Sequence, residues 1–207
     1  MVFTFHNTVE LAGIMAFAMS GALSAMQKKL DVFGVLVLTF ATAVGGGTIR
    51  DLIIGSLPVA WLKDMELITA MFMSYLIVLF FSKYLKTLTH TLFWLDTIGL
   101  AFFCMIAIDK GITFQLNPAI CIALGTITGS FGGIIRDVLL NEIPYVFRKD
   151  VYASACIAGG IIYFLLRQVM DDYNHASILS GSLIIVIRVG AKYFNWQMPD
   201  IYKKQIK

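Results

Sequence analysis

The feature that most constrains this chain is the recurrence of apolar stretches long enough to cross a lipid bilayer. A helix rises about 1.5 Å per residue, so about 20 residues cover a hydrocarbon core of about 30 Å. Charged residues make up only 14% of the 207 residues, against roughly 25% in soluble domains. We therefore predict an all-α membrane protein that forms one transmembrane domain over residues 1–207. The seven predicted spans are Val9–Gln27, Val32–Ser56, Met65–Ser82, Leu92–Ile108, Pro118–Leu140, Val151–Leu166 and Ile178–Phe194.

The sequence also repeats itself. Glu10, Gly13 and Phe17 align with Asp96, Gly99 and Phe103, each 86 residues later (96 − 10). The motif Gly-Gly-x-Ile-Arg-Asp recurs at the same offset. Repeat one covers about 5–86 and repeat two about 91–172, while the seventh helix, about 177–194, has no counterpart. Three spans per repeat force the second copy to enter the membrane upside down, as in many transporters.

The distribution of basic residues predicts the orientation, because Lys and Arg accumulate on the cytoplasmic side of short loops. One side holds Lys63, Lys110 and Arg167. The other side holds Lys28, Lys29, Lys83, Lys86, Arg148, Lys149, Lys192, Lys203, Lys204 and Lys207. We therefore expect an external N-terminus and a cytoplasmic C-terminus. Topology accounts for the net charge of +3, so no nucleic-acid partner is implied.

Glycines interrupt the second span of each repeat, in Gly45-Gly46-Gly47-Thr48 and in Gly129-Ser130-Phe131-Gly132-Gly133. Glycine disfavours helix by about 1 kcal/mol relative to Ala, and broken helices mark the substrate path in inverted-repeat proteins. We expect the backbone to kink or unwind here and to expose carbonyl groups to a cation path. The candidate path residues are Thr42, Gly45, Gly46, Gly47, Thr48, Arg50, Asp51, Thr128, Gly129, Ser130, Gly132, Gly133, Arg136 and Asp137.

Each feature has a structural alternative. The glycines could serve close helix packing, and the hydroxyl groups of Thr42 and Thr128 could bond back to their own helices. Ionisable residues inside a membrane usually face a cavity or a partner. Arg50 and Asp51 are about 100° apart on a helix, so we expect one to face the path and the other a neighbouring helix. Pairing across the repeats, Arg50 with Asp137 and Arg136 with Asp51, and a purely structural salt bridge both remain open.

Other polar residues receive simpler interpretations. Arg188 and Lys192 are one turn apart near the cytoplasmic end of the last span, and we expect both to extend toward lipid headgroups. The three cysteines lie in apolar spans and receive no redox or metal role. No cofactor, tight metal site or catalytic arrangement is indicated, so the sequence does not predict an enzyme.

The doubled motif Gly46–Asp51 and Gly132–Asp137, followed by Leu57-Pro58 and Ile143-Pro144, resembles the prokaryotic relatives of the trimeric intracellular cation (TRIC) channels. The resemblance covers essentially the whole chain. It implies a homotrimer with one pore per subunit, lined by the second and fifth helices and permeable to monovalent cations, chiefly potassium. The same bacterial group is also labelled a glycine transporter domain family. Animal members carry Lys-Glu-Gly at the kinks, where this chain has Arg-Asp, so lipid-dependent gating is not carried over.

Two functions follow as hypotheses. The first is a potassium-permeable channel in a bacterial or archaeal cell membrane, with lipids as neighbours and potassium held transiently near Gly45, Gly46, Gly132 and Gly133. The alternative is a secondary transporter of a small zwitterion such as glycine, since inverted repeats are common in transporters.

Overall fold

The computed structural model is entirely helical within the residues it describes, 5–81, 88–170 and 172–199, apart from one isolated β-bridge. The helices are α1 (Phe5–Gln27), α2 (Val32–Ile53), α3 (Ala60–Lys63), α4 (Met65–Phe81), α5 (Leu88–Thr113), α6 (Pro118–Leu139), η2 (Tyr145–Phe147), α7 (Ala153–Leu166) and α8 (Tyr173–Tyr193). The predicted spans match α1, α2 and α4–α8 within a few residues. Lys83, Lys86, Lys203, Lys204 and Lys207, used for the orientation, lie outside the described residues.

Five of these helices, α1, α2, α5, α6 and α8, are long and apolar enough to cross a membrane. The helices α4 and α7 are also apolar but have only 17 and 14 residues. At 1.5 Å per residue they cover about 26 and 21 Å, less than a typical hydrocarbon core. A count of seven spans therefore stays a prediction.

The two repeats share local backbone details as well as sequence. Asp31 and Asn117 occupy the N-cap positions of α2 and α6, and their side chains accept hydrogen bonds from Gly34 N and Ala119 N at 2.7 and 3.0 Å. Gly55 and Asn141 both have positive φ, 70° and 55°, just after these helices end. Both pairs are separated by 86 residues (117 − 31 and 141 − 55). The local signals that begin and end the two helices are thus duplicated.

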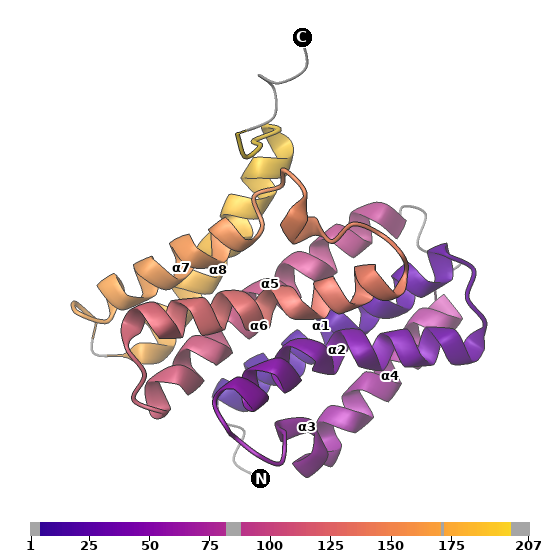
Figure 1. Ribbon diagram of the computed structural model, residues 1–207, viewed down its shortest axis with the longest axis horizontal. Helices are drawn as coiled ribbons and strands as arrows, with labels where there is room; N and C mark the ends of the chain where they lie inside the picture. Colours follow the sequence, from indigo (N-terminus) through magenta and orange to yellow (C-terminus); the bar gives the residue numbers. More distant parts are fainter. Residues whose placement is uncertain (1–4, 82–87, 171, 200–207) are drawn as a thin grey trace.

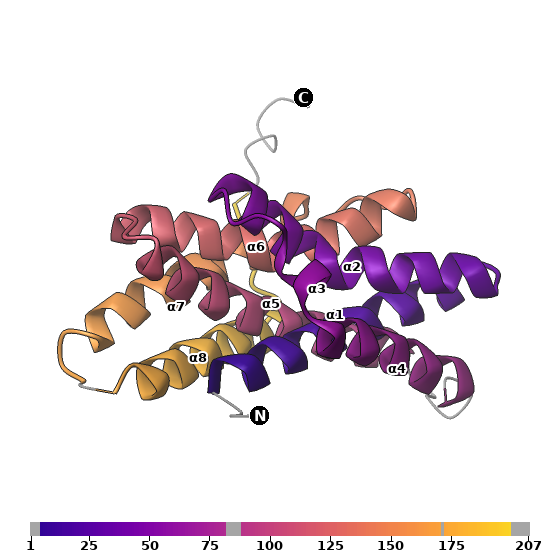
Figure 2. The same ribbon diagram turned by 90° about the horizontal axis from the view of Figure 1, so that it is seen from below.

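The helices α1, α2, α5 and α6 form the centre of the molecule (Figures 1 and 2). Within it, α1 packs against α2 and α5, and α2 packs against α6. The helix α4 lies against α1 on one side, while α7 and α8 pack together on the other (Figure 1). In Figure 1, α1 begins near the lower edge and α8 ends at the upper edge.

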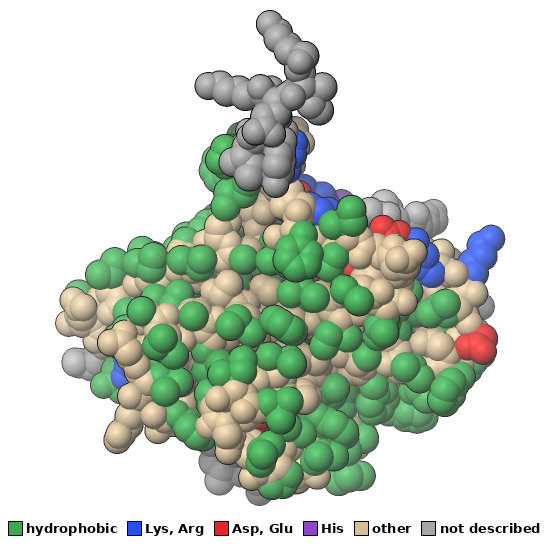
Figure 3. Space-filling view, in the orientation of Figure 1, with side chains coloured by type: hydrophobic (Ala, Val, Ile, Leu, Met, Phe, Trp, Pro, Cys, Tyr) green, Lys and Arg blue, Asp and Glu red, His purple; other side chains and the backbone are tan. Residues whose placement is uncertain are grey.

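The surface of the molecule is largely apolar. Figure 3 shows hydrophobic side chains over most of one face, with charged side chains mainly along its upper and right edges. Exposed large side chains include Phe33, Phe80 and Val186, which are 71%, 64% and 65% exposed. Such a surface suits a surrounding of lipid or of further protein rather than water.

Candidate functional site

Gly46 and Gly132 of the doubled motif lie where α2 and α6 pack closely against each other. A Cβ atom on Gly46 would lie 2.1 Å from the Thr128 carbonyl oxygen, and one on Gly132 would lie 2.7 Å from the Thr42 carbonyl oxygen. These two contacts relate the same pair of positions in opposite repeats. Each glycine therefore provides the space into which a backbone carbonyl of the other helix fits.

The expectation was that the two helices kink or unwind at the glycines; unwinding is wrong, while a kink stays a prediction. The α-helix runs without interruption from Val32 to Ile53 and from Pro118 to Leu139, through both glycine groups. The packing alternative explains Gly46 and Gly132, because their missing side chains admit the neighbouring backbone. Gly129 plays a similar part against α5, since a Cβ there would lie 2.8 Å from the Leu100 carbonyl oxygen.

The hydroxyl groups near the crossing mostly bond within the protein. Thr42 Oγ1 donates to the Leu38 carbonyl at 2.6 Å, and Thr128 Oγ1 donates to the Leu124 carbonyl at 2.7 Å. Both hydroxyl groups thus donate hydrogen bonds to their own helices, which was the structural alternative to a role in the cation path. Thr48 Oγ1 accepts a hydrogen bond from Trp61 Nε1 at 3.1 Å, whereas Gly45 is buried with the Ile135 methyl group beside it.

The first Arg-Asp pair forms an ion cluster at the C-terminal end of α2. Arg50 Nε donates to Asp51 Oδ1 at 2.8 Å, and Lys110 Nζ of α5 binds the same oxygen at 2.7 Å. The other Asp51 oxygen accepts from Ala60 N at 2.8 Å, which ties down the loop after α2. Glu10 Oε1 of α1 lies 3.8 Å from Arg50 Nη2. We call Glu10, Arg50, Asp51 and Lys110 the outer cluster, after the predicted external position of the N-terminus; it contains two cations and two carboxylates.

The second pair forms a corresponding inner cluster of Asp96, Arg136, Asp137 and Arg188. Arg136 Nε donates to Asp137 Oδ1 at 2.8 Å, and Arg136 Nη1 donates to Asp96 Oδ1 at 2.9 Å. Asp96 Oδ2 accepts from Arg188 Nη1 of α8 at 2.8 Å. The side chains are 0 to 9% exposed, so the two guanidinium groups are neutralised by two carboxylates away from water.

These contacts correct the expected orientation of the motif. The two neighbouring residues bind each other in each repeat, although their Cα directions diverge, because the arginine side chain is long enough to fold back. No pairing of Arg50 with Asp137, or of Arg136 with Asp51, occurs. Instead each arginine binds an acidic residue of its own repeat, Glu10 or Asp96. Arg188 is 4% exposed and does not extend toward headgroups, so that expectation is also wrong.

Sequence reasoning therefore missed four residues of the two clusters: Glu10, Asp96, Lys110 and Arg188. The first two were visible as an acidic match between the repeats, without an assigned role. Arg188 carried a signal too, because an ionisable residue within an apolar span usually has a buried partner. Lys110 carried no such signal, since it lies at the end of its span.

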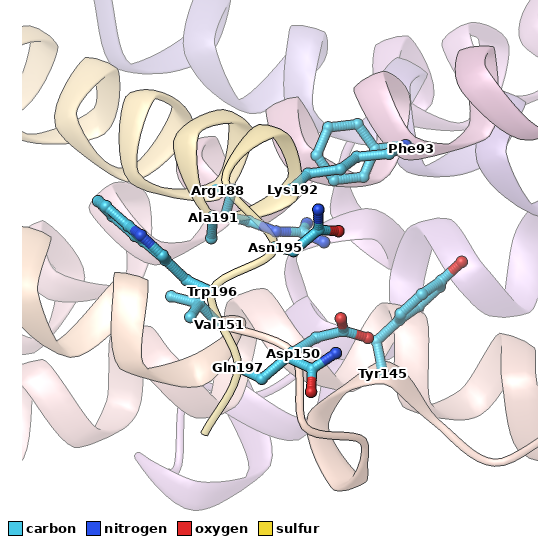
Figure 4. A pocket seen from close by; sticks show the side chains of 10 residues that line it. All are labelled: Phe93, Tyr145, Asp150, Val151, Arg188, Ala191, Lys192, Asn195, Trp196 and Gln197. Atoms are coloured by element: carbon cyan, nitrogen blue, oxygen red, sulfur yellow. The ribbon is translucent and has the colours of Figure 1, made fainter. Parts of the chain in front are cut away.

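Two open cavities lie at opposite ends of the helix bundle. The outer cavity, of about 310 Å³, is lined by His6, Glu10, Arg50, Ala60, Asp109, Lys110 and Thr113. The inner cavity, of about 280 Å³, lies between the end of α8 and the segment before α7 (Figure 4). It is lined by Phe93, Tyr145, Asp150, Val151, Arg188, Ala191, Lys192, Asn195, Trp196 and Gln197. Of the predicted path residues, Arg50 alone lines either of these two cavities.

Comparison with known proteins shows which family has this sequence and arrangement. The family model described as "Glycine transporter" matches residues 7–83 and again residues 93–168. The chain belongs to the Glycine transporter family. The two segments that match the Glycine transporter model begin 86 residues apart (93 − 7), which is the offset of the sequence repeat.

Its relatives include bacterial membrane proteins, and the similarity extends over most of the length of both chains. The UPF0126 membrane protein of Vibrio cholerae is 40% identical over 196 residues, covering 92% of this chain and 80% of that protein. The UPF0126 inner membrane protein YadS of Escherichia coli K12 is 39% identical, covering 92% of this chain and 93% of that protein.

Solved structures of TRIC channels are similar to this chain. The TRIC trimeric intracellular cation channel orthologue from Rhodobacter sphaeroides superposes with a TM-score of 0.87 and is 29% identical, covering 92% of this chain and 98% of its own. A second TRIC cation channel structure has a TM-score of 0.83 and 33% identity, covering 100% of this chain and 99% of its own. The arrangement of the helices in this chain is thus that of a TRIC channel.

Proposed function

We propose that this protein is a monovalent cation channel, permeable to potassium, with one conduction path in each subunit. The observation that carries the proposal is the similarity to a TRIC cation channel, 33% identical over the whole chain with a TM-score of 0.83. The two cavities support it, because a channel needs water-accessible openings at both ends of the bundle.

The path is proposed to run between the outer and inner cavities, beside α2 and α6. Phe93 lines the inner cavity and Lys110 the outer one, and their offset of 17 residues (110 − 93) corresponds to about 26 Å along α5. Between the two cavities the bundle is tightly packed: the rings of Phe17 and Phe103 stack with centroids 5.2 Å apart. In this proposal, conduction requires the packing between the two cavities to open, and the closed state of the channel corresponds to the packed arrangement.

The arginines are compatible with a cation path because their charge is matched. The outer cluster contains Arg50 and Lys110 against Glu10 and Asp51. The inner cluster contains two arginines against two aspartates. Neither cluster presents excess positive charge, so neither sets up a long-range barrier to potassium.

The finer parts of the proposal follow the same similarity. They are a homotrimer in the cell membrane, seven spans in two inverted repeats, an external N-terminus and a cytoplasmic C-terminus. Transient binding of potassium near Gly45, Gly46, Gly132 and Gly133 requires the α2–α6 crossing to open, because these glycines contact protein in the closed arrangement.

The test is electrical recording from the purified protein in a planar bilayer with potassium chloride on both sides. A cation channel gives discrete unitary currents, and a potassium gradient shifts the reversal potential toward that of potassium. Reversal at the chloride potential, or a complete absence of unitary currents from folded protein, would contradict the proposal.

A second candidate is a transporter of a small zwitterion such as glycine, in line with the description of the family model. The outer cavity favours it, because Glu10 and Asp109 could hold an ammonium group while Arg50 and Lys110 could hold a carboxylate. Saturable uptake of radiolabelled glycine into proteoliposomes, without unitary currents, would favour this function over the channel.

A further inference from the structure

The helix outside the repeat contributes two cations, Arg188 and Lys192, to the inner cavity, where Asp150 is the one carboxylate among the lining residues. Lys192 of α8 lines the inner cavity, and its ammonium group lies 3.7 Å from the centroid of the Phe93 ring. A cation over an aromatic face is held by the ring's electrostatic field. Figure 4 shows Lys192 and Phe93 on one side of the cavity and Asp150 on the other.

The formal charges at the two cavities differ by one unit. The outer cavity is lined by Glu10 and Asp109 against Arg50 and Lys110, which sum to zero. The inner cavity is lined by Arg188 and Lys192 against Asp150, which sum to +1. The remaining members of the two clusters can also be counted. Adding Asp51 changes the charge at the outer end from 0 to −1. Adding Asp96, Asp137 and Arg136 changes the charge at the inner end from +1 to 0. The difference therefore does not depend on whether the buried partners are counted.

We propose that Lys192 sets the rectification of the channel, by lowering the concentration of cations at the inner mouth relative to the outer mouth. This inference rests on the proposed function. Potassium then enters more readily from the outer cavity than from the inner one, even when both solutions have the same composition. The inverted repeat alone would give matched ends, and α8 removes this symmetry.

The size of the effect follows from Coulomb's law. One unit charge about 6 Å from a cation in water changes the local cation concentration by roughly threefold. Salt screens this effect, since the Debye length falls from about 10 Å at 0.1 M to about 3 Å at 1 M. The ratio of unitary currents at equal and opposite voltages should thus be about three at low salt and close to one at 1 M.

The experiment measures this ratio for a charge series in planar bilayers with symmetric potassium chloride. Vesicles of one orientation are selected by the accessibility of a tag fused after Lys207. Lys192→Arg keeps the charge and should keep the ratio, whereas Lys192→Gln should bring it close to one. Lys192→Glu should reverse the preferred direction, and Asp150→Asn should increase the ratio. Lys29→Gln is the matched control, because Lys29 is exposed in the loop after α1 and does not line the inner cavity.

Wild-type rectification in Lys192→Gln, or an equal change in Lys29→Gln, would overturn the inference while leaving the channel intact. A ratio that does not fall at 1 M salt would do the same, because it would exclude a screened charge as the cause. Should Lys192→Gln fail to fold, Asp150→Asn tests the same charge difference with the opposite sign. A wild type that gives no unitary currents contradicts the proposed function itself, so the two failures are distinguishable.

Discussion

Replacing Gly46 with alanine tests whether α2 and α6 meet as closely as described. The new Cβ atom would lie 2.1 Å from the Thr128 carbonyl oxygen, whereas ordinary contacts begin at 3.4 Å. The obstructing atom belongs to the backbone of α6, so the helices must separate by roughly 1 Å. Overpacking of this kind typically costs about 1–3 kcal/mol.

Gly47→Ala provides the matched comparison. A Cβ atom at Gly47 would lie 3.9 Å from both Arg50 Nη2 and a ring carbon of Phe103, which is ordinary van der Waals contact. Both substitutions lie in α2 and bring the same change in helix propensity, about 1 kcal/mol. That term cancels between the variants, so their difference in stability reports the α2–α6 contact. We expect Gly46→Ala to be less stable than Gly47→Ala by about 1–3 kcal/mol.

The assay is denaturant-induced unfolding of the two purified variants in the same mild detergent, followed by near-ultraviolet circular dichroism. Gly132→Ala should behave like Gly46→Ala with a smaller loss, because its Cβ atom would lie 2.7 Å from the Thr42 carbonyl. Equal stability of Gly46→Ala and Gly47→Ala would refute the packing role. The glycines would then have to act through helix flexibility, as the sequence suggested.

Two further predictions concern charges. Arg188→Leu removes one of the two cations that bind Asp96 in a buried cluster, so we expect a loss of about 3–5 kcal/mol in the same unfolding assay. Exposed Lys28 binds Glu142 and holds the pKa of that carboxyl group below its usual value. A depressed carboxyl pKa stabilises the fold above the unfolded pKa and loses this effect as pH falls through the folded pKa. The melting temperature of the wild type should therefore fall more on acidification than that of Glu142→Gln, and parallel curves for the two proteins would contradict this.

The sequence predicts the positions of the helices well, because hydropathy and length report burial in lipid directly. The glycines illustrate where this reasoning ends. A glycine pair in an apolar helix is compatible both with a break and with a close approach. The choice depends on the carbonyl group of Thr128, which is contributed by a different helix 82 residues away (128 − 46).

The ion clusters show the same limit. The repeat alignment paired Glu10 with Asp96 but gave no indication of what either residue binds. Arg188 lies near the C-terminal end of its span, where a long basic side chain commonly reaches headgroups. Its actual partner is Asp96, and only the packing of α8 against α5 brings the two together. Position within a span therefore did not predict the partner of Arg188.

The two copies of the Arg-Asp motif lie in clusters that differ in their exposure to water. In the outer cluster, the side chains of Glu10 and Lys110 are 19% and 20% exposed and face an open cavity. In the inner cluster, the side chains of Asp96 and Arg188 are 1% and 4% exposed. Water reaches the partly exposed members of the outer cluster more readily than Asp96 and Arg188, so the loss of an ion-pair partner costs more at the inner end. The same four-charge arrangement is therefore harder to separate at the inner end, where α8 supplies Arg188.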